Sequence, residues 1–414
     1  MIGQTRRVTA AARSDGRGVS SPAGKRGIAP ARPVDQRRAR VLHVISTLLR
    51  GGTEMAMLHL IRTLDPVRYE FRVAYLRGEP VLGAEVEGAI GAPLESIGLR
   101  RKIDPVALLR LISYVRRERI DLVHTHMDLA DYYGAAAARL GGARGVLSTR
   151  HNADEFRMRR TWKRYPFLLL ERLSYEAADR VVGVSQGVVD FLAASEYLPR
   201  RKMMVIPNGV EPALLEHPPD RSAARARSKL PPFQPLLGCV GRLEPQKGHT
   251  YLLQALPALL ATRPGAGLVI AGDGPLRAEL EAEARRLGIA DRVHFPGYHH
   301  DVPALLAALD LFVLPSLWEG LSKALLEAMA VGCPIVASRA VGVTEVLRDG
   351  EEGILVPLRD AGALAGAMER ALGDPGLAGR LGRAARQRVI EHYSMRTVGS
   401  AFDQLYREIL TWKR

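Results

Sequence analysis

Three consecutive segments decide the fold of this chain: Leu311-Phe-Val-Leu314, Pro315-Ser-Leu-Trp-Glu-Gly320 and Leu321-Ser-Lys-Ala-Leu-Leu-Glu-Ala-Met-Ala-Val331. The four apolar residues predict a buried parallel strand, and the segment between proline and glycine predicts a turn. The third segment consists mostly of strong helix formers and predicts a helix. A second apolar strand, Pro334–Ala337, follows directly. This order of strand, turn, helix and strand is typical of a doubly wound α/β sheet.

Two carboxylates stand eight positions apart at the start of this helix, Glu319 on the turn and Glu327 on the helix. The amino end of a helix offers free N–H groups and a positive dipole end, so Leu321, Ser322 and Lys323 predict a diphosphate site. Glu327, roughly one and a half turns further on, is suited to accept hydrogen bonds from two ribose hydroxyls, and Glu319 to reach a sugar. The alternative is a capped helix whose glutamates face solvent. Because the same unit recurs elsewhere in the chain, the ligand site is favoured.

The length of 414 residues, of which 47% are hydrophobic, allows two ordinary cores and favours two domains. There are only two cysteines, Cys239 and Cys333, and both have glycine and apolar neighbours. We therefore expect two core thiols in a reducing compartment, not a disulfide or metal ligands.

The net charge of +15 is concentrated at the amino end, where the first 40 residues hold ten Lys or Arg and two Asp. This tail has no apolar periodicity, so we expect it to be disordered. It lacks the apolar region of a secretory signal, and the chain has no run of about 18 apolar residues. These features predict a cytoplasmic protein, and a peripheral contact at the inner face of the membrane stays open.

A second basic segment, Arg157-Met-Arg-Arg-Thr-Trp-Lys-Arg164, precedes an apolar stretch at 166–170. Basic residues around a tryptophan favour an anionic interface, such as acidic lipid or a lipid-diphosphate acceptor. A solvated basic helix face with Trp162 in the core is the alternative. No nucleic-acid module accompanies the charge, so nucleic acid is not an expected partner.

The first half of the chain contains a series of apolar strands, most of which end in polar residues. The expected strands are 40–45, 71–75, 94–97, 121–126, 145–149, 180–184 and 203–206. Between them, 105–119 is expected to form an amphipathic helix with Leu108, Leu109, Ile112 and Val115 on one side.

Two features of this half predict ligand contacts. Gly51 and Gly52 follow the first strand and precede a helix over 55–63, and paired glycines let backbone approach a ligand closely. His124 and His126 point to the same side of their strand, and His126 lies at its carboxyl end. Since ligands of doubly wound sheets bind at that end, His126 is a candidate site residue.

The second half repeats the pattern from the strand 236–240 and its turn 241–248 onward. Arg242 and Lys247 in this glycine-bounded turn are suited to a diphosphate. Further strands are expected at 268–271 and 293–295. The turn after the last of these, Pro296-Gly-Tyr298, has a backbone placed to contact a nucleobase edge.

The ordered set of motifs resembles the family 4, GT-B fold, retaining glycosyltransferases over about residues 40–410. The motifs that carry the resemblance are Gly51-Gly-Thr-Glu54, His126, Val184-Ser185, Ile206-Pro-Asn-Gly-Val210, Gly241-Arg242 with Lys247-Gly248, Ala271-Gly-Asp-Gly274 and the pair Glu319 and Glu327.

The resemblance implies two Rossmann-like domains that face each other across a cleft. After the tail at 1–39, the resemblance implies an acceptor-binding domain at 40–206 and a nucleotide-sugar domain at 207–393. A final helix at 394–414 then returns to the first domain. By matching position, Arg242 and Lys247 bind the diphosphate and Glu327 the ribose. Glu319 then lies at the transferred sugar with His126 nearby, and Gly51 and Gly52 lie near the phosphates or the acceptor.

The implied reaction moves a hexose from a nucleoside-diphosphate sugar to a hydroxyl acceptor, with the anomeric configuration retained and without a metal or other cofactor. UDP is the favoured carrier and GDP the second, and a lipid-linked or cell-surface saccharide is a plausible acceptor. Lys323 departs from the pattern of many relatives, and it either favours an anionic donor sugar or faces outward. Two alternatives are a GT-B nucleotide-sugar epimerase and a non-enzymatic basic scaffold at membranes or nucleic acid.

Overall fold

The structure is a computed structural model that describes residues 37–152, 165–194, 200–227 and 230–411. The expected disordered tail at 1–39 therefore lies almost wholly outside the described residues, and so does the basic segment 157–164. The described residues from Arg38 onward form one compact unit. In the part of the chain that is described, we find no helix long and apolar enough to cross a membrane.

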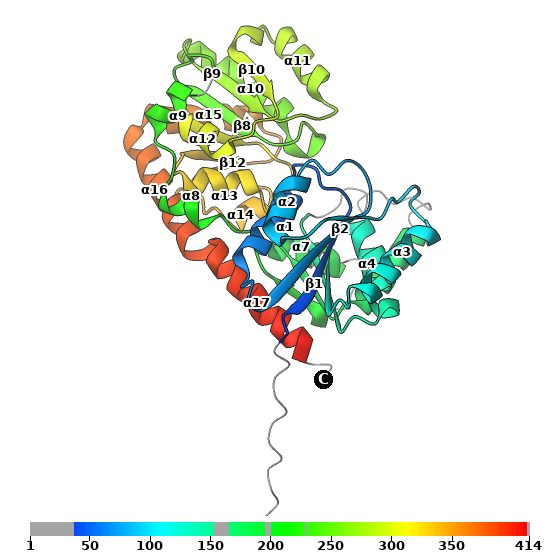
Figure 1. Ribbon diagram of the computed structural model, residues 1–414. Helices are drawn as coiled ribbons and strands as arrows, with labels where there is room; N and C mark the ends of the chain where they lie inside the picture. Colours follow the sequence, from blue (N-terminus) through cyan, green and yellow to red (C-terminus); the bar gives the residue numbers. More distant parts are fainter. Residues whose placement is uncertain (1–36, 153–164, 195–199, 228–229, 412–414) are drawn as a thin grey trace, which may run out of the picture. The chain divides into compact units, whose positions relative to one another are not determined.

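The unit contains two parallel β-sheets, one from each half of the chain (Figure 1). The first has the order β3-β2-β1-β4-β5-β6-β7 and the second the order β10-β9-β8-β11-β12-β13. The strands of the first sheet are β1 (Ala39–Ile45), β2 (Tyr69–Tyr75), β3 (Glu95–Ser96), β4 (Leu122–His126), β5 (Gly145–Arg150), β6 (Arg180–Gly183) and β7 (Met203–Val205). Those of the second are β8 (Leu236–Val240), β9 (Gly267–Ala271), β10 (Val293–Gly297), β11 (Leu311–Leu314), β12 (Ile335–Ser338) and β13 (Ile354–Val356).

Helices connect the strands in both halves. The first half contains α1 (Gly52–Thr63), α2 (Gly83–Ile90), α3 (Pro105–Arg117), α4 (Asp128–Gly141), α6 (Tyr165–Ala177) and α7 (Gln186–Ala194). The second half contains α8 (Pro212–Glu216), α9 (Arg221–Arg227), α10 (His249–Thr262), α11 (Arg277–Arg286), α12 (Val302–Ala308), α13 (Lys323–Ala330), α14 (Val341–Thr344), α15 (Ala361–Gly373), α16 (Pro375–His392) and α17 (Met395–Thr411). Short 3₁₀ turns cover Arg200–Lys202, Pro245–Lys247 and Ala290–Arg292.

The order of strands creates one reversal point in each sheet. In the first sheet β1 pairs with β2 on one side and β4 on the other, and in the second β8 pairs with β9 and β11. Doubly wound sheets bind ligands outside the carboxyl ends of strands at such reversal points. The turns after β1, β4, β8 and β11 are therefore where the fold favours a site.

The last helix, α17, packs against the first sheet, as the resemblance implied. Figure 1 shows α17 beside β1 and α1, and its residues Phe402, Tyr406 and Ile409 belong to the same core cluster as β1 and β2. The Tyr406 hydroxyl also forms a 2.7 Å hydrogen bond with Nδ1 of His124 on β4. The carboxyl-terminal helix is thus anchored in the core of the amino-terminal sheet.

Three local predictions need correction. The helix expected at 55–63 begins at Gly52, and the one expected at 321–331 begins at Lys323. On α3, Leu109 is 62% exposed and does not belong to the apolar side, which includes Ala107, Leu111, Ile112 and Val115. At 100° a residue, Leu109 falls outside the stripe that these four residues share. Cys239 and Cys333 are buried free thiols, as expected.

Candidate functional site

One cavity of about 1110 Å³ lies at the carboxyl ends of both sheets. All eleven candidate residues line it: Gly51, Gly52, His126, Arg242, Lys247, Tyr298, Glu319, Leu321, Ser322, Lys323 and Glu327. They come from the last residue of β4, from the turns after β1, β8, β10 and β11, and from the beginnings of α1 and α13. The structure therefore brings together residues that are up to 276 positions apart in the chain.

Lys247 contacts Glu319 from a neighbouring turn of the second sheet. The Lys247 ammonium donates to Oε1 of Glu319 at 2.6 Å, and the Ser316 hydroxyl donates to the same oxygen at 2.6 Å. Gly248 makes this approach possible, since it has φ +63° and a Cβ there would meet the Pro315 carbonyl oxygen at 2.1 Å. Both partners are largely buried, with 15% of the Lys247 and 5% of the Glu319 side chain exposed. Their attraction is therefore less screened than that of a surface pair.

Arg242 is the more accessible cation of the cavity. Its side chain is 64% exposed and donates to Oε1 of Glu244 at 2.7 Å. It lies at the carboxyl end of β8, two residues past Val240. An exposed guanidinium of this kind is free to turn toward a bound phosphate at little cost in solvation.

The amino end of α13 opens on the cavity. Ser322 is its N-cap, and the Ser322 hydroxyl accepts a hydrogen bond from the Leu325 N–H at 3.4 Å. This bond explains why the helix begins two residues later than expected, because a serine that caps a helix has extended backbone geometry. One turn into the helix, Lys323 and Glu327 form an ion pair. In the structure both glutamates of the candidate site are therefore bonded to lysines.

The turn before α13 touches the first half of the chain. A Cβ on Gly320 would meet the carbonyl oxygen of His151 at 2.1 Å and Cα of Asn152 at 3.0 Å, so only glycine fits there. The side-chain N–H of Asn208 donates to the Leu321 carbonyl at 3.3 Å. The end of β5 and the segment after β7 thus hold the turn that carries Glu319.

The glycine pair after β1 lies at the start of α1. Gly51 is the N-cap, where a Cβ would meet Oε2 of Glu54 at 2.5 Å, whereas a Cβ on Gly52 would meet no described atom within 4 Å. The Thr47 hydroxyl donates to Glu54 at 3.1 Å. Burial raises the pKa of Glu54, and the charge of Arg242 acts in the opposite direction. A cation of the second half therefore influences a carboxyl of the first.

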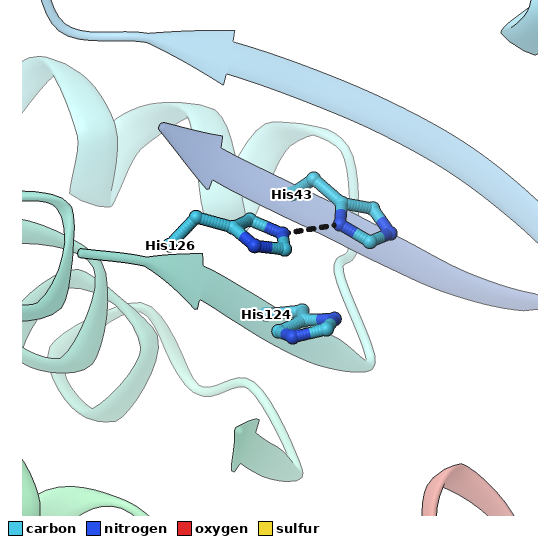
Figure 2. A group of neighbouring side chains, drawn as sticks. All are labelled: His43, His124 and His126. Carbon is cyan, nitrogen blue, oxygen red and sulfur yellow. Dashed lines mark hydrogen bonds between the residues drawn. The ribbon is translucent and has the colours of Figure 1, made fainter. Parts of the chain in front are cut away.

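His126 belongs to a cluster of three buried histidines, with His43 and His124 (Figure 2). Nitrogen atoms of His43, His124 and His126 all lie within 4.8 Å of one another, which is the spacing of a candidate metal centre. However, Nδ1 of His43 and Nε2 of His126 form a 2.9 Å hydrogen bond, and both His124 nitrogens bond to hydroxyls, of Tyr406 and Thr149, at 2.7 Å. The group contains no carboxylate to offset the charge of an ion. These contacts favour a hydrogen-bonded cluster over a metal site.

Tyr298 lies at the cavity edge after β10, with its side chain 46% exposed and its ring 5.1 Å from the ring of His300. The expectation that this turn contacts a nucleobase stays a prediction.

Several cavity residues that connect distant segments of the chain were not predicted from the sequence. The main-chain carbonyl of Gln246 accepts a hydrogen bond from the Leu317 N–H at 2.8 Å. Its side-chain N–H donates to the Trp318 carbonyl at 2.9 Å. His151 and Asn208 also line the cavity, and neither was among the candidate residues. Their position just after β5 and β7 was the available signal, since polar residues at carboxyl ends of parallel strands often serve a site.

The buried histidines predict that stability falls in acid. Burial lowers the pKa of His43 and His59 to about 3, and that of His151 and His249 to about 4. These groups bind protons more readily in the unfolded chain, where their pKa is about 6.5. Their stabilisation is therefore complete above pH 6.5 and is lost as the pH falls toward 3. Urea unfolding at pH 7.5 and pH 5.5 should show a lower free energy of unfolding at pH 5.5, and equal values would contradict these assignments.

Two family models match the chain. One, described as "Glycosyl transferases group 1", matches residues 220–388, and the other, "Glycosyltransferase Family 4", matches residues 50–214. A putative glycosyltransferase EpsF of Bacillus subtilis is 30% identical over 308 residues, which cover 73% of this chain and 79% of that protein.

A second relative and a solved structure agree with these matches. The relative is an Escherichia coli UDP-Gal:alpha-D-GlcNAc-diphosphoundecaprenol alpha-1,3-galactosyltransferase, 29% identical over 66% of this chain and 71% of its own length. The solved structure is Anabaena HepE in complex with UDP and glucose, with a TM-score of 0.77 and 21% identity over 89% of this chain and 100% of its own. The chain is therefore a glycosyltransferase that belongs to family 4 and has the GT-B fold.

Proposed function

We propose that this glycosyltransferase moves a hexose from a nucleoside-diphosphate sugar to a hydroxyl of a saccharide acceptor, with retention of the anomeric configuration. One observation carries the proposal: Arg242, Lys247 and the amino end of α13 line the same cavity as Glu319 and Glu327. Cations and a helix amino end suit a diphosphate, and carboxylates suit the hydroxyls of ribose and sugar.

The donor and acceptor classes draw support from the relatives. The name of the E. coli relative specifies a UDP-activated sugar and a diphosphoundecaprenol-linked acceptor, and HepE was solved with UDP and glucose. We therefore favour UDP over GDP as the carrier and a lipid-linked saccharide as the acceptor. We expect the bound diphosphate to take up the charge of Lys323, which also lines the cavity, so we favour a neutral hexose over an anionic sugar.

Donor binding exchanges partners within the site. In the structure Lys247 bonds to Glu319 and Lys323 to Glu327. A bound diphosphate offers both ammonium groups a more highly charged partner, while sugar and ribose hydroxyls offer hydrogen bonds to the carboxylates. The site thus changes its contacts without a buried group being left unpaired, which would be costly.

The transfer itself requires stabilisation of the leaving group. The acceptor oxygen attacks the anomeric carbon on the face from which the diphosphate departs, as the carbon–oxygen bond to phosphate breaks. The acceptor proton passes to the leaving phosphate oxygen, so charge and atoms balance. Arg242, Lys247 and the α13 dipole then lower the barrier by stabilising the growing negative charge, and a metal ion is not required for that role.

Two other functions are less well supported. A nucleotide-sugar epimerase would alter the donor sugar without any acceptor, and a basic scaffold would have no use for the paired carboxylates. The family assignment favours the transferase over both. Incubation with donor alone separates them, since we expect at most slow hydrolysis and no new sugar isomer.

Nucleotide binding provides the direct test of the donor site. At a hundred times its dissociation constant, a ligand adds about 2.7 kcal/mol to stability, so UDP and UDP-sugars should raise the melting temperature. Glu327→Ala should weaken UDP binding by roughly 10- to 100-fold, because a charge-assisted hydrogen bond is lost. Glu281→Ala, which removes a carboxylate of an exposed pair with Arg277 on α11, is the matched control and should leave UDP binding unchanged. Equal affinities for UDP in the wild type and Glu327→Ala would refute the ribose assignment.

A further inference from the structure

Three loops lie side by side at the carboxyl edge of the first sheet. They follow β1, β2 and β3, which are neighbours in the order β3-β2-β1. Backbone hydrogen bonds join the loops: the Leu82 N–H donates to the Leu48 carbonyl at 3.0 Å, and the Leu99 N–H donates to the Leu76 carbonyl at 2.7 Å. The loop after the edge strand β3 leads directly into α3 (Figure 1). We call the surface of these segments the loop face, and it comprises residues 46–51, 76–82 and 97–110.

Exposed apolar side chains are concentrated on the loop face. Of the thirteen large hydrophobic side chains that are exposed in the described part of the chain, five lie here, each 51–67% exposed: Leu49, Val81, Ile103, Val106 and Leu109. Single exposed apolar residues are ordinary, whereas a group of them on one surface indicates a place of interaction. On α3, Val106 and Leu109 are three positions apart and therefore share one side of the helix. The group indicates an apolar partner.

The same surface is strongly basic. Six Lys or Arg of the loop face stand against two acidic residues, Glu79 and Asp104. Arg50 forms an ion pair with Glu85 on α2. The other five basic residues are exposed: Arg77, Arg100, Arg101, Lys102 and Arg110. Apolar side chains among cations match the surface of an anionic bilayer, where acyl chains accept the former and lipid phosphates the latter. A nucleic acid would match the cations but would leave the aliphatic side chains in water.

The loop face extends to the opening of the cavity. Leu49, Arg50 and Val81 line that cavity, and because Leu49 and Val81 are also exposed, they lie at its opening. A lipid-linked acceptor holds its lipid in the bilayer and its saccharide in the adjoining water. Contact between the loop face and the bilayer therefore brings the opening of the cavity close to the saccharide. This continuity favours a bilayer over a protein as the partner of the loop face.

We propose that the loop face docks on the surface of an anionic lipid bilayer. In this contact the apolar side chains at the start of α3 enter the boundary between headgroups and acyl chains, and the neighbouring cations bind lipid phosphates. The docking surface differs from the basic segment 157–164, for which the sequence predicted an anionic interface. The delivery of a lipid-linked acceptor rests on the proposed function, whereas docking itself requires only the bilayer.

Vesicle cosedimentation tests the docking surface. The full-length protein, without donor or acceptor, should bind vesicles of phosphatidylcholine with about 30% phosphatidylglycerol at least roughly tenfold more tightly than vesicles of phosphatidylcholine alone. Leu109→Asp should weaken binding to the anionic vesicles about tenfold or more, because an inserted apolar side chain is lost. Val67→Asp is the matched control, since Val67 is 79% exposed just before β2, at the opposite edge of the sheet. Its binding should stay within about twofold of wild type. Equal binding of the two variants would overturn the proposal, and so would a wild-type protein that does not distinguish the two kinds of vesicle.

A second pair of variants tests the cations in the same assay. Arg100→Gln with Arg101→Gln should weaken binding to the anionic vesicles at least about fivefold. Arg285→Gln with Arg286→Gln, two exposed arginines of α11, should leave it within about twofold of wild type. Equal losses in the two pairs would show attraction by net charge alone and would contradict a docking surface. Because the assay contains no substrate, its failure is distinct from failure of the proposed transferase function, which UDP binding by Glu327→Ala tests separately.

Discussion

Replacement of Lys247 by alanine should lower kcat about 10²- to 10³-fold, the range found when one donor to a developing charge is removed. Lys247 is the least exposed of the cations that we place at the diphosphate, with 15% of its side chain accessible, so its field there is poorly screened. The leaving diphosphate gains negative charge as its bond to the sugar breaks. The loss should therefore appear mainly in kcat, as measured by steady-state turnover with saturating donor.

A control separates this electrostatic effect from general damage. Arg286→Ala removes a cation whose side chain is 66% exposed and paired with Glu283 on α11, outside the cavity, and it should leave kcat unchanged. Circular dichroism should show that Lys247→Ala stays folded at the assay temperature. Turnover of a folded Lys247→Ala variant within a few-fold of wild type would remove Lys247 from the diphosphate site.

Gly320→Ala should cause the second large effect, in both stability and activity. The added methyl group would lie 2.1 Å from the His151 carbonyl oxygen and 3.0 Å from Cα of Asn152. Both atoms belong to backbone, so the turn must move away from β5. Overpacking of this kind costs roughly 1–3 kcal/mol. Because the turn carries Glu319, a displacement of about 1 Å would also lower activity roughly 10²-fold.

The matched control is Gly366→Ala, on an exposed face of α15. A Cβ there meets no described atom within 4 Å, and the backbone is helical. Alanine should stabilise this helix by up to about 1 kcal/mol and leave turnover unchanged. Urea unfolding and steady-state kinetics of the two variants give the comparison. A Gly320→Ala enzyme as stable and active as Gly366→Ala would mean that the turn does not need its contact with β5.

The apolar runs of the sequence predict the strands and their order along the chain. The apolar runs of β8 and β11 match the expected strands at 236–240 and 311–314 residue for residue. The helix starts could not be predicted as well, because they depend on single contacts. The hydrogen bond that the Leu325 N–H donates to the Ser322 hydroxyl places the start of α13 at Lys323. The spacing of hydrophobic residues does not predict such a bond.

In the candidate site, too, the sequence predicts which residues are candidates but not the contacts between them. Position after the carboxyl end of a strand predicted Arg242, Lys247 and Glu319 as candidate site residues, and all three line the cavity. Their pairing could not be predicted, since Lys247 and Glu319 are 72 positions apart and meet only because the turns after β8 and β11 are neighbours. The contacts of His151 and Asn208 with the turn before α13 likewise exist only between the two halves of the chain.

The structure of the protein in complex with UDP tests the central claim most directly. We predict that the diphosphate lies within hydrogen-bond distance of the Lys247 ammonium and of the first N–H groups of α13, with the ribose hydroxyls on Glu327. Binding of UDP with its diphosphate on other groups, away from Lys247 and from the amino end of α13, would contradict the claim.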